Sequence, residues 1–384
     1  VATGMLTNVG FASLRSNQVA GSFSPDKNVL VEAEQFDDIG GWVIDQQFMD
    51  QMGSPYLLAH GLGNPVKDAT TYVKFPKKGK YRVWVRTKDW VAPWYAPGAP
   101  GKFEIHVNNK PLKTIFGTEG AQWHWQDGGL VNIKNKNVLL SIHDLTGFEG
   151  RCDAILFTRD HDMIPPDEGK ELEMLRMDLG GISRELKYFN DFDLVVTGGG
   201  IAGTCAAISA ARHGAKVALV QDRPVCGGNN SSEVRVWLGG TTNCEPYPRV
   251  GDIVRELEQT SRAHYGPDNT ADLYEDEKKL ALLRNEENIT LFLWHRANNV
   301  QTQKNEIKSI IIQDILSGQR KKLSARYFAD CTGDGSVGYL AGSDSDITVN
   351  NHMGRCNLWN IKETDSEVSF PRCTWAFDLY DKPF

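Results

Sequence analysis

The sequence lacks the features that mark membrane-spanning, nucleic-acid-binding or metal-rich proteins. No apolar run reaches the roughly 18–20 residues that cross a bilayer, and a formal net charge of −7 offers no basic surface for nucleic acid or an anionic membrane. The seven cysteines lie far apart without a CxxC pair, which argues against a zinc site or a compact disulfide framework. No internal repeat, low-complexity tract or signal peptide is visible, although a mature secreted protein would also lack the last of these.

Length and local pattern divide the chain into two domains. A chain of 384 residues is longer than one ordinary hydrophobic core supports. In its first half, apolar and polar residues alternate in short runs separated by Gly, Pro and Asn, as in an antiparallel β-sandwich. From residue 193 the order becomes strand, helix, strand, which is typical of a parallel α/β sheet. The strands expected in the first half cover residues 29–33, 71–75, 80–86, 102–107, 137–142 and 154–158.

A linker with one helix joins the two domains. Pro165 and Pro166 end the first domain because proline resists both helices and central strands. A charged helix then follows over 168–186, interrupted by two glycines. The prediction is a multidomain protein with an N-terminal extension (1–27), an all-β sandwich (28–160), a linker with a helix (161–190) and an α/β Rossmann-type domain with inserted β elements (191–384).

A glycine-rich turn follows the first apolar strand of the second domain. Gly198, Gly200 and Gly203 fit G-x-G-x-x-G, and an alanine-rich helix, a capping glycine and a second apolar strand come next. The first glycine allows a tight turn, the second lets the backbone approach a pyrophosphate, and the third lets helix and strand pack closely. Ile201 and Ala202 begin the helix, whose unpaired N–H groups attract anions. This context predicts a dinucleotide-binding domain.

The second strand ends on Gln221, where dinucleotide-binding domains usually place an acid that binds the adenosine ribose. Gln221 can still hydrogen-bond a ribose hydroxyl, but without charge. The next residue, Asp222, either replaces that acid or is a solvated turn residue, and the sequence leaves both alternatives open.

Two further segments favour FAD over NAD as the ligand. The first is an R-P-x-x-G-G loop with a polar continuation, formed by Arg223, Gly227, Gly228, Asn229, Asn230 and Ser231. The second is a strand that ends in D-x-T-G-D-G and contains Thr332, Gly333 and Asp334. With the strand and hairpin around residues 289–314, these segments resemble the FAD-dependent oxidoreductases built on the glutathione-reductase type of Rossmann domain. The resemblance covers about 192–384.

The resemblance implies where the cofactor lies and which features are missing. The glycine pair would follow the pyrophosphate and ribityl chain of FAD, and residues 332–334 would lie beside the cofactor. Members with a redox-active disulfide carry C-x₄-C after the glycine pair, and this chain does not. We therefore expect Cys205, Cys226 and Cys331 to be buried small residues. Related proteins usually continue with more substrate domain, so we expect the last domain to be incomplete at its C-terminus.

The first strand of the N-terminal domain contains V-E-A-E, with Glu32 and Glu34. This segment and the closing strand at 151–158 resemble carbohydrate-binding jelly-roll modules, in which such acids often hold a structural calcium. The alternative is an exposed pair of acids on an edge strand. Six aromatic residues outside the strands either stack on sugar faces or pack in the interior: Trp42, Trp90, Trp94, Tyr95, Trp123 and Trp125.

The predicted function is FAD-dependent oxidation of a small molecule, a carbohydrate or glycoside, with hydride passing from a hydroxyl-bearing carbon to the flavin. His352 is the candidate general base, and Arg235 is a second candidate that alternatively forms a structural ion pair with Glu233. An NAD-dependent enzyme, a non-catalytic carbohydrate-binding protein and a redox-neutral elimination remain alternatives. The carbohydrate-binding resemblance favours a periplasmic or secreted location.

Overall fold

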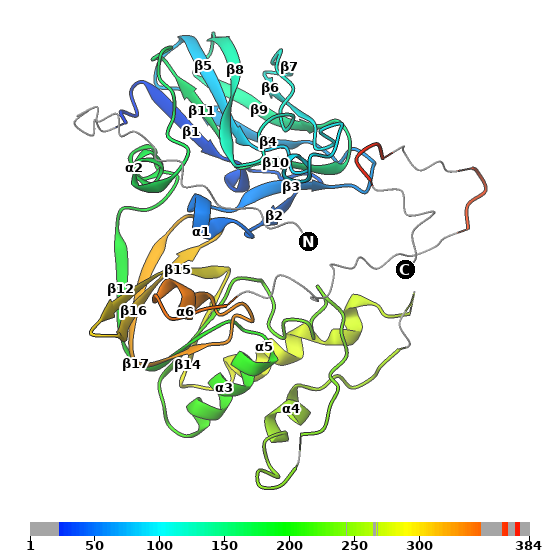
Figure 1. Cartoon of the computed structure of the whole chain (residues 1–384), viewed down its shortest axis with the longest axis vertical. Coiled ribbons are helices and arrows are strands. Elements are labelled where there is room, and N and C mark those ends of the chain that lie inside the picture. Colours follow the sequence, from blue (N-terminus) through cyan, green and yellow to red (C-terminus); the bar gives the residue numbers. More distant parts are fainter. Residues whose placement is uncertain are drawn as a thin grey trace, which may run out of the picture.

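The computed structural model describes residues 23–242, 244–263, 266, 268–346, 363–367 and 373–376. Antiparallel strands form the N-terminal part, and an α/β arrangement forms the C-terminal part below it (Figure 1). Among the described residues, no helix combines the length and apolar character needed to cross a membrane.

The N-terminal part contains mostly strands, as its alternating pattern predicts. Its strands are β1 (Asn28–Glu32), β2 (Val43–Asp45), β3 (Tyr56–His60), β4 (Ala69–Lys74), β5 (Gly79–Thr87), β6 (Phe103–Val107), β7 (Lys110–Pro111), β8 (His124–Ile133), β9 (Asn137–Asp144), β10 (Phe148–Cys152) and β11 (Ala154–Thr158). Its helices are short: η1 (Ala33–Gln35), α1 (Met49–Met52) and η2 (Ala92–Trp94).

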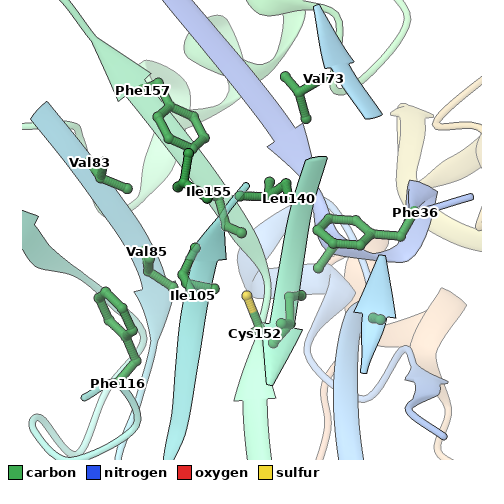
Figure 2. Close-up of a cluster of buried hydrophobic side chains, with 14 of the residues drawn as sticks. Phe36, Val73, Val83, Val85, Ile105, Phe116, Leu140, Cys152, Ile155 and Phe157 are labelled. Carbon is green, nitrogen blue, oxygen red and sulfur yellow. The ribbon is translucent and has the colours of Figure 1, made fainter. Parts of the chain in front are cut away.

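Two four-stranded antiparallel sheets, in the orders β1-β11-β5-β8 and β4-β9-β6-β7, share one hydrophobic core. Side chains from alternate positions meet there, including Val83, Val85 and Phe157 from the first sheet and Ile105 and Leu140 from the second (Figure 2). Alternation places these side chains on one face of each strand. A third antiparallel sheet, β10-β3-β2, adjoins them.

A linker helix covers the outer face of the first sheet. Helix α2 (Gly169–Leu179) packs Leu172 and Leu175 against Trp84 and Trp125, and all four side chains are buried. The helix ends at Gly180, which has a φ of +89°, the left-handed conformation that favours glycine. The part of the first sheet around Trp84 and Trp125 is therefore covered on both faces.

The C-terminal part is an α/β domain with inserted antiparallel strands. Its elements are β12 (Leu186–Thr197), α3 (Ile201–Arg212), β13 (Val217–Gln221), α4 (Asp252–Leu257), η3 (Ala271–Tyr274), α5 (Asp276–Arg284), β14 (Ile289–Leu293), β15 (His295–Gln303), β16 (Glu306–Asp314), β17 (Arg320–Asp330) and α6 (Ser336–Leu340).

These strands form one six-stranded mixed sheet in the order β14-β13-β12-β17-β16-β15. Strands β14, β13, β12 and β17 run parallel to one another. Strand β16 pairs antiparallel with β17, and β15 pairs antiparallel with β16. Helices α3, α4 and α5 contribute to the apolar cluster on one face of the sheet. Strand β12 begins at Leu186 rather than at residue 193, because residues 186–189 pair with the start of β17. The carboxyl ends of β12, β13 and β17 therefore lie along one edge.

Candidate functional site

The main cavity of the C-terminal domain lies at the carboxyl ends of its parallel strands. It has a volume of about 520 Å³, and its wall includes Thr197 at the end of β12, Gln221 at the end of β13 and Cys331 directly after β17. Open α/β sheets bind ligands at this edge. All the residues that the sequence predicts as cofactor contacts line this cavity except Gly203 and Ser231.

The three glycines of the first turn have different tasks. Gly198 has a φ of +98°, and an added Cβ would lie 2.2 Å from the Cys331 carbonyl oxygen. A Cβ at Gly203 would lie 1.8 Å from the Gly198 carbonyl oxygen. At Gly200 an added Cβ would meet only the Cα of Gly228, at 4.0 Å. The first and third glycines are therefore required for packing, whereas the second leaves space open beside the cavity.

The N-terminus of α3 faces the same space. The residue before this twelve-residue helix is Gly200, so no side chain caps its first N–H groups, and Ile201 and Ala202 line the cavity. Free N–H groups and the helix dipole make such an end favourable for an anion. The turn thus combines an open backbone surface with a partial positive charge.

A second glycine loop lies against the first. The Gly227 amide donates to the Gly199 carbonyl oxygen over 2.8 Å, and a Cβ at Gly228 would come within 3.1 Å of the Gly200 Cα. Beneath the loop, Ser231 Oγ donates to the Gly228 carbonyl oxygen over 2.7 Å. The two glycine loops therefore form adjoining walls of one cavity, and Ser231 supports that wall without lining it.

A buried lysine on α5 supports this second loop. Lys279 has no exposed surface, and its ammonium donates to the carbonyl oxygen of Tyr274 and lies 3.8 Å from Asp276 Oδ1. Burial lowers the pKa of Lys279, and the Asp276 carboxylate opposes that effect. Both oxygens of Asp276 accept the Ser232 amide over 3.2 Å. Sequence reasoning missed this pair, because a D-E-K-K segment reads as a solvated helix face.

Gln221 is occupied within the protein. Its Oε1 accepts the Gly199 amide over 2.7 Å, and its Nε2 donates to the Val225 carbonyl oxygen over 2.8 Å. The side chain therefore ties the first turn to the loop that follows β13. The Asp222 side chain, in contrast, lines the cavity, and its Oδ2 lies 3.5 Å from Arg296 Nη1.

The D-x-T-G-D-G segment divides between structure and cavity. Asp330 accepts hydrogen bonds from Thr332 Oγ1 and from the amides of Val337 and Gly338. Burial raises the pKa of Asp330, but these hydrogen bonds outweigh burial and the net pKa is lowered. The first acid of the motif thus caps α6, and the predicted residues Thr332, Gly333 and Asp334 line the cavity.

The charged residues near the glycine loop pair differently from the sequence prediction. Glu233 pairs with Arg223, at 2.8 Å to Nε and 3.0 Å to Nη2, and not with Arg235. Arg235 does not line the cavity; its Nε donates to the Ser232 carbonyl oxygen over 3.0 Å. The predicted ion pair between Arg235 and Glu233 is therefore wrong, and the Arg235 side chain supports the loop. His352 lies outside the described residues.

Among the cavity residues that the sequence analysis did not predict are two with basic side chains, His295 and Arg296. His295 and Arg296 reach the wall because the segment from 289 to 301 breaks at Trp294, whose φ is +57°. Burial lowers the pKa of His295, and its two ring nitrogens face the Leu293 carbonyl oxygen at 2.6 Å and Lys321 Nζ at 2.6 Å. Both nitrogens are engaged, so this imidazole is not placed to act as a base.

The structure confirms the prediction of a buried thiol for Cys226 only, because Cys205 and Cys331 are half-buried. Cys205, Cys226 and Cys331 are free thiols. Burial raises the pKa of Cys226 to about 12 and that of Cys205 to about 11, and it also raises the pKa of Cys331. Thiolates are therefore disfavoured at all three positions.

The acids proposed as calcium ligands lie in a different environment. Glu32 and Glu34 are 3% and 5% exposed, so they are not an exposed edge pair. Glu32 forms an ion pair with Arg176 of α2, which also pairs with Asp153. A guanidinium therefore occupies the place that a cation would take. Within the described residues, no group of three or more His, Cys, Asp or Glu side chains is arranged to hold a metal ion.

The aromatic residues divide into two groups. Trp42, Trp123 and Trp125 are buried, so their predicted alternative role in packing is the observed one. Trp94 and Tyr95 are 60% and 96% exposed in the loop that contains η2. Trp90 is half-buried, so among these six residues Trp94 and Tyr95 are the ones that expose most of their aromatic surface.

Comparison with known proteins agrees with the geometry of the cavity. The family model described as FAD dependent oxidoreductase matches residues 193–356. This segment is therefore similar to the FAD-dependent oxidoreductases, and the match supports FAD as the cofactor of the cavity. No curated protein sequence matches the chain significantly.

Solved structures match a share of the chain of similar size. L-proline dehydrogenase from P. horikoshii is 19% identical over 39% of this chain and 24% of its own, with a TM-score of 0.25. The myxobacterial chondrochloren halogenase is 18% identical over 38% of this chain and 38% of its own, with a TM-score of 0.25. A geranylgeranyl bacteriochlorophyll reductase-like protein from Thermoplasma acidophilum is 17% identical over 43% of this chain and 44% of its own, with a TM-score of 0.28. The chain spans less than half of each protein, and TM-scores of this size do not establish a common overall fold.

Proposed function

We propose that this chain is an FAD-dependent oxidoreductase that removes hydride from a hydroxyl-bearing carbon of a carbohydrate or glycoside. The observation that carries the proposal is the cavity between two adjoining glycine loops at the carboxyl ends of β12, β13 and β17. Its residues fit a dinucleotide, because Gly200 leaves room that any side chain would fill and α3 directs its uncapped N-terminus at the same room.

Each part of the cavity suits one part of FAD. Gly198, Gly200, Ile201 and Ala202 would hold the pyrophosphate, with Gly203 allowing the close approach of α3. Asp222 would bind the adenosine ribose, because Gln221 already uses both of its polar atoms within the protein. The remaining predicted residues that line the cavity would follow the rest of the cofactor: Arg223, Gly227, Gly228, Asn229 and Asn230 along the pyrophosphate and ribityl chain, and Thr332, Gly333 and Asp334 beside it. Ser231 would hold the second loop from behind through its hydrogen bond to Gly228.

Bound FAD supplies a ring nitrogen that accepts hydride. The task of the chain is to orient the donor carbon and to take the hydroxyl proton. His352 remains the proposed base from the sequence. The neutral ring of His295 stays bound to Leu293 and Lys321 and supports the wall of the cavity.

The sugar part of the proposal rests on the N-terminal domain, for which we propose a jelly-roll-like, carbohydrate-binding role. Trp94 and Tyr95 expose large aromatic surfaces, and Trp90 packs edge-on against Trp94 with ring centroids 6.0 Å apart. Aromatic faces of this kind stack on the C–H faces of sugars, and a loop on a rigid sheet is a suitable place for them.

The first experiment is an absorbance spectrum of the purified full chain before and after denaturation. Flavin bands, with FAD released on unfolding, support the cofactor part of the proposal. A colourless protein that also takes up no added FAD contradicts it. Anaerobic bleaching by sugars, with amino acids and dicarboxylic acids as control donors, then tests the substrate class. Bleaching by a control donor alone contradicts only the carbohydrate part.

The exposed aromatic pair gives a second test of the substrate class. Replacing Trp94 and Tyr95 together with alanine should raise the KM for a bleaching sugar by about tenfold, at the upper end of the effect of aromatic contacts. FAD content should not change. The matched control is Tyr72→Ala, which removes a 66% exposed aromatic ring from β4. An equal effect of both changes would remove the aromatic loop from the proposal.

A further inference from the structure

The N-terminal domain contacts the wall of the FAD cavity through one buried side chain. Gln46, just after β2, is 5% exposed, and its Nε2 donates to the backbone carbonyl oxygen of Asp222 over 3.1 Å. Asp222 directly follows β13 and lines the cavity. A residue of the first domain thus hydrogen-bonds the backbone of a cavity residue in the second, 176 positions away along the chain.

The turn that Gln46 contacts is held from several sides. The Trp294 amide donates to the Arg223 carbonyl oxygen over 3.4 Å, and Arg296 Nη1 lies 3.5 Å from Asp222 Oδ2. Both of these contacts come from the C-terminal domain itself. Gln46 supplies the hydrogen bond from the other domain, and it is buried, so water cannot readily replace it.

A second glutamine joins the domains in the opposite direction. Gln313 of β16 is 2% exposed, and its Nε2 donates to the Gly53 carbonyl oxygen, directly after α1, over 2.8 Å. The two glutamines make the same type of buried interdomain hydrogen bond. They differ at the cavity, because Asp222 lines it and neither Gln313 nor Gly53 does. Gln313 Oε1 also accepts a hydrogen bond from Asn298 Nδ2 over 2.8 Å.

We propose that docking of the N-terminal domain and binding of FAD are coupled through Gln46, which acts as a positioning residue for the turn at Asp222 and Arg223. The inference rests on the proposed function and adds a role for the N-terminal domain at the cofactor site. Coupling between two binding events is reciprocal. The docked domain strengthens FAD binding, and bound FAD strengthens docking by the same factor.

The test compares variants of the full chain by titrating FAD into the apoprotein and following quenching of flavin fluorescence. Gln46→Ala should raise the Kd for FAD about tenfold, which corresponds to ~1.4 kcal/mol. Gln313→Ala should lower the Tm of the apoprotein as much as Gln46→Ala does but leave the Kd within about twofold of the parent value. Gln47→Ala, at the exposed neighbouring position, should change neither quantity.

A second variant separates the hydrogen bond from general loosening of the interface. Gln46→Glu keeps the size of the side chain but cannot donate to the Asp222 carbonyl oxygen, so it should weaken FAD binding at least as much as alanine does. A parent-like Kd in either Gln46 variant, or an equal rise in Kd in Gln313→Ala, overturns the coupling. If the parent chain binds no FAD, the proposed function itself fails, and the inference fails with it.

Discussion

The buried ionic cluster of the N-terminal domain and the cavity of the C-terminal domain use polar groups in opposite ways. In the cluster, Glu32 and Asp153 surround Arg176, and Arg86 Nη1 donates to Asp153 Oδ2 over 2.9 Å. The charges there are paired with one another. In the cavity, the wall includes uncapped backbone N–H groups at the start of α3 and Gly200, whose added Cβ would meet only the Gly228 Cα at 4.0 Å.

This difference shows which property indicates a binding site. Burial is the largest cause of pKa shifts in both regions: it raises the pKa of Glu34, and it lowers the pKa of His295. Removal of one member of a buried ion pair leaves an uncompensated charge and strongly destabilises a domain. Uncapped backbone at the carboxyl ends of parallel strands contributes to ligand binding instead. The contrast predicts that variants in the cluster change stability and that variants in the cavity change affinity.

The largest effect should follow removal of Arg176. Arg176→Met keeps much of the side-chain volume but leaves Glu32 and Asp153 with one cation fewer, so the free energy of unfolding should fall by ~3–5 kcal/mol. Denaturant unfolding measures this change, with Lys170→Met at an exposed position of the same helix as the control. FAD affinity of the folded variant should stay parent-like. A variant that keeps its stability but loses FAD would reverse the contrast.

The second effect is on affinity rather than stability. Gly200 has a φ of −62°, which any residue adopts, and an added side chain would enter open space. Gly200→Val should therefore fold with a nearly unchanged Tm and bind FAD at least about 100-fold more weakly, or ~2.7 kcal/mol. Gly338→Ala is the control, since its Cβ would meet only an ordinary contact at 3.9 Å. Parent-like FAD binding by Gly200→Val would remove the first turn from the cofactor site.

The third effect tests a buried charge that supports the second glycine loop of the cavity wall. Lys279→Met removes the hydrogen bond to Tyr274 and the ion pair that holds Asp276 under the second glycine loop. We expect FAD binding to weaken about tenfold, or ~1.4 kcal/mol. The control is Lys278→Met, because the side chain of Lys278 is 39% exposed on the same helix. Equal Kd values in the two variants would assign Lys279 to stability alone, as in the cluster.

The parts of this site that were predictable from sequence depend on local backbone requirements. Gly198 needs a positive φ, and Gly203 packs five residues away against the Gly198 carbonyl oxygen, so their spacing carries the information. The strand, helix and capping glycine around them are equally local. The family match to residues 193–356 confirms the resulting identification of an FAD-dependent oxidoreductase segment.

The unpredicted parts depend on contacts between distant residues. Arg176 meets Glu32 across 144 positions, so the V-E-A-E segment gave no sign of its partner. Trp125 is buried because α2 covers its side of the sheet. His295 and Arg296 line the cavity because the chain turns at Trp294 with a positive φ, which no sequence pattern indicated. In each case the missing information was tertiary packing.

The smallest effect separates the two regions by the sign of their pH dependence. The pKa of Glu34 is raised by burial, so the unfolded chain loses this proton first, near pH 4.5, and the stability of the N-terminal domain falls as pH rises above that value. The pKa of His295 is lowered by burial. The unfolded chain therefore takes up this proton first, near pH 6.5, and the stability of the C-terminal domain falls as pH drops below that value. Between pH 4.5 and 6.5 the two slopes oppose each other.

Hydrogen exchange at pH 5, 6 and 7 measures both slopes in one sample, because strands of each domain report separately. Glu34→Gln should flatten the slope of the N-terminal domain, and His295→Gln should flatten that of the C-terminal domain. His213→Gln, at an exposed position after α3, is the control for the second change. Slopes of the same sign in both domains would mean that these two buried groups do not control the pH dependence. Opposite slopes that vanish separately in the two variants would locate the control of pH dependence in one side chain of each domain.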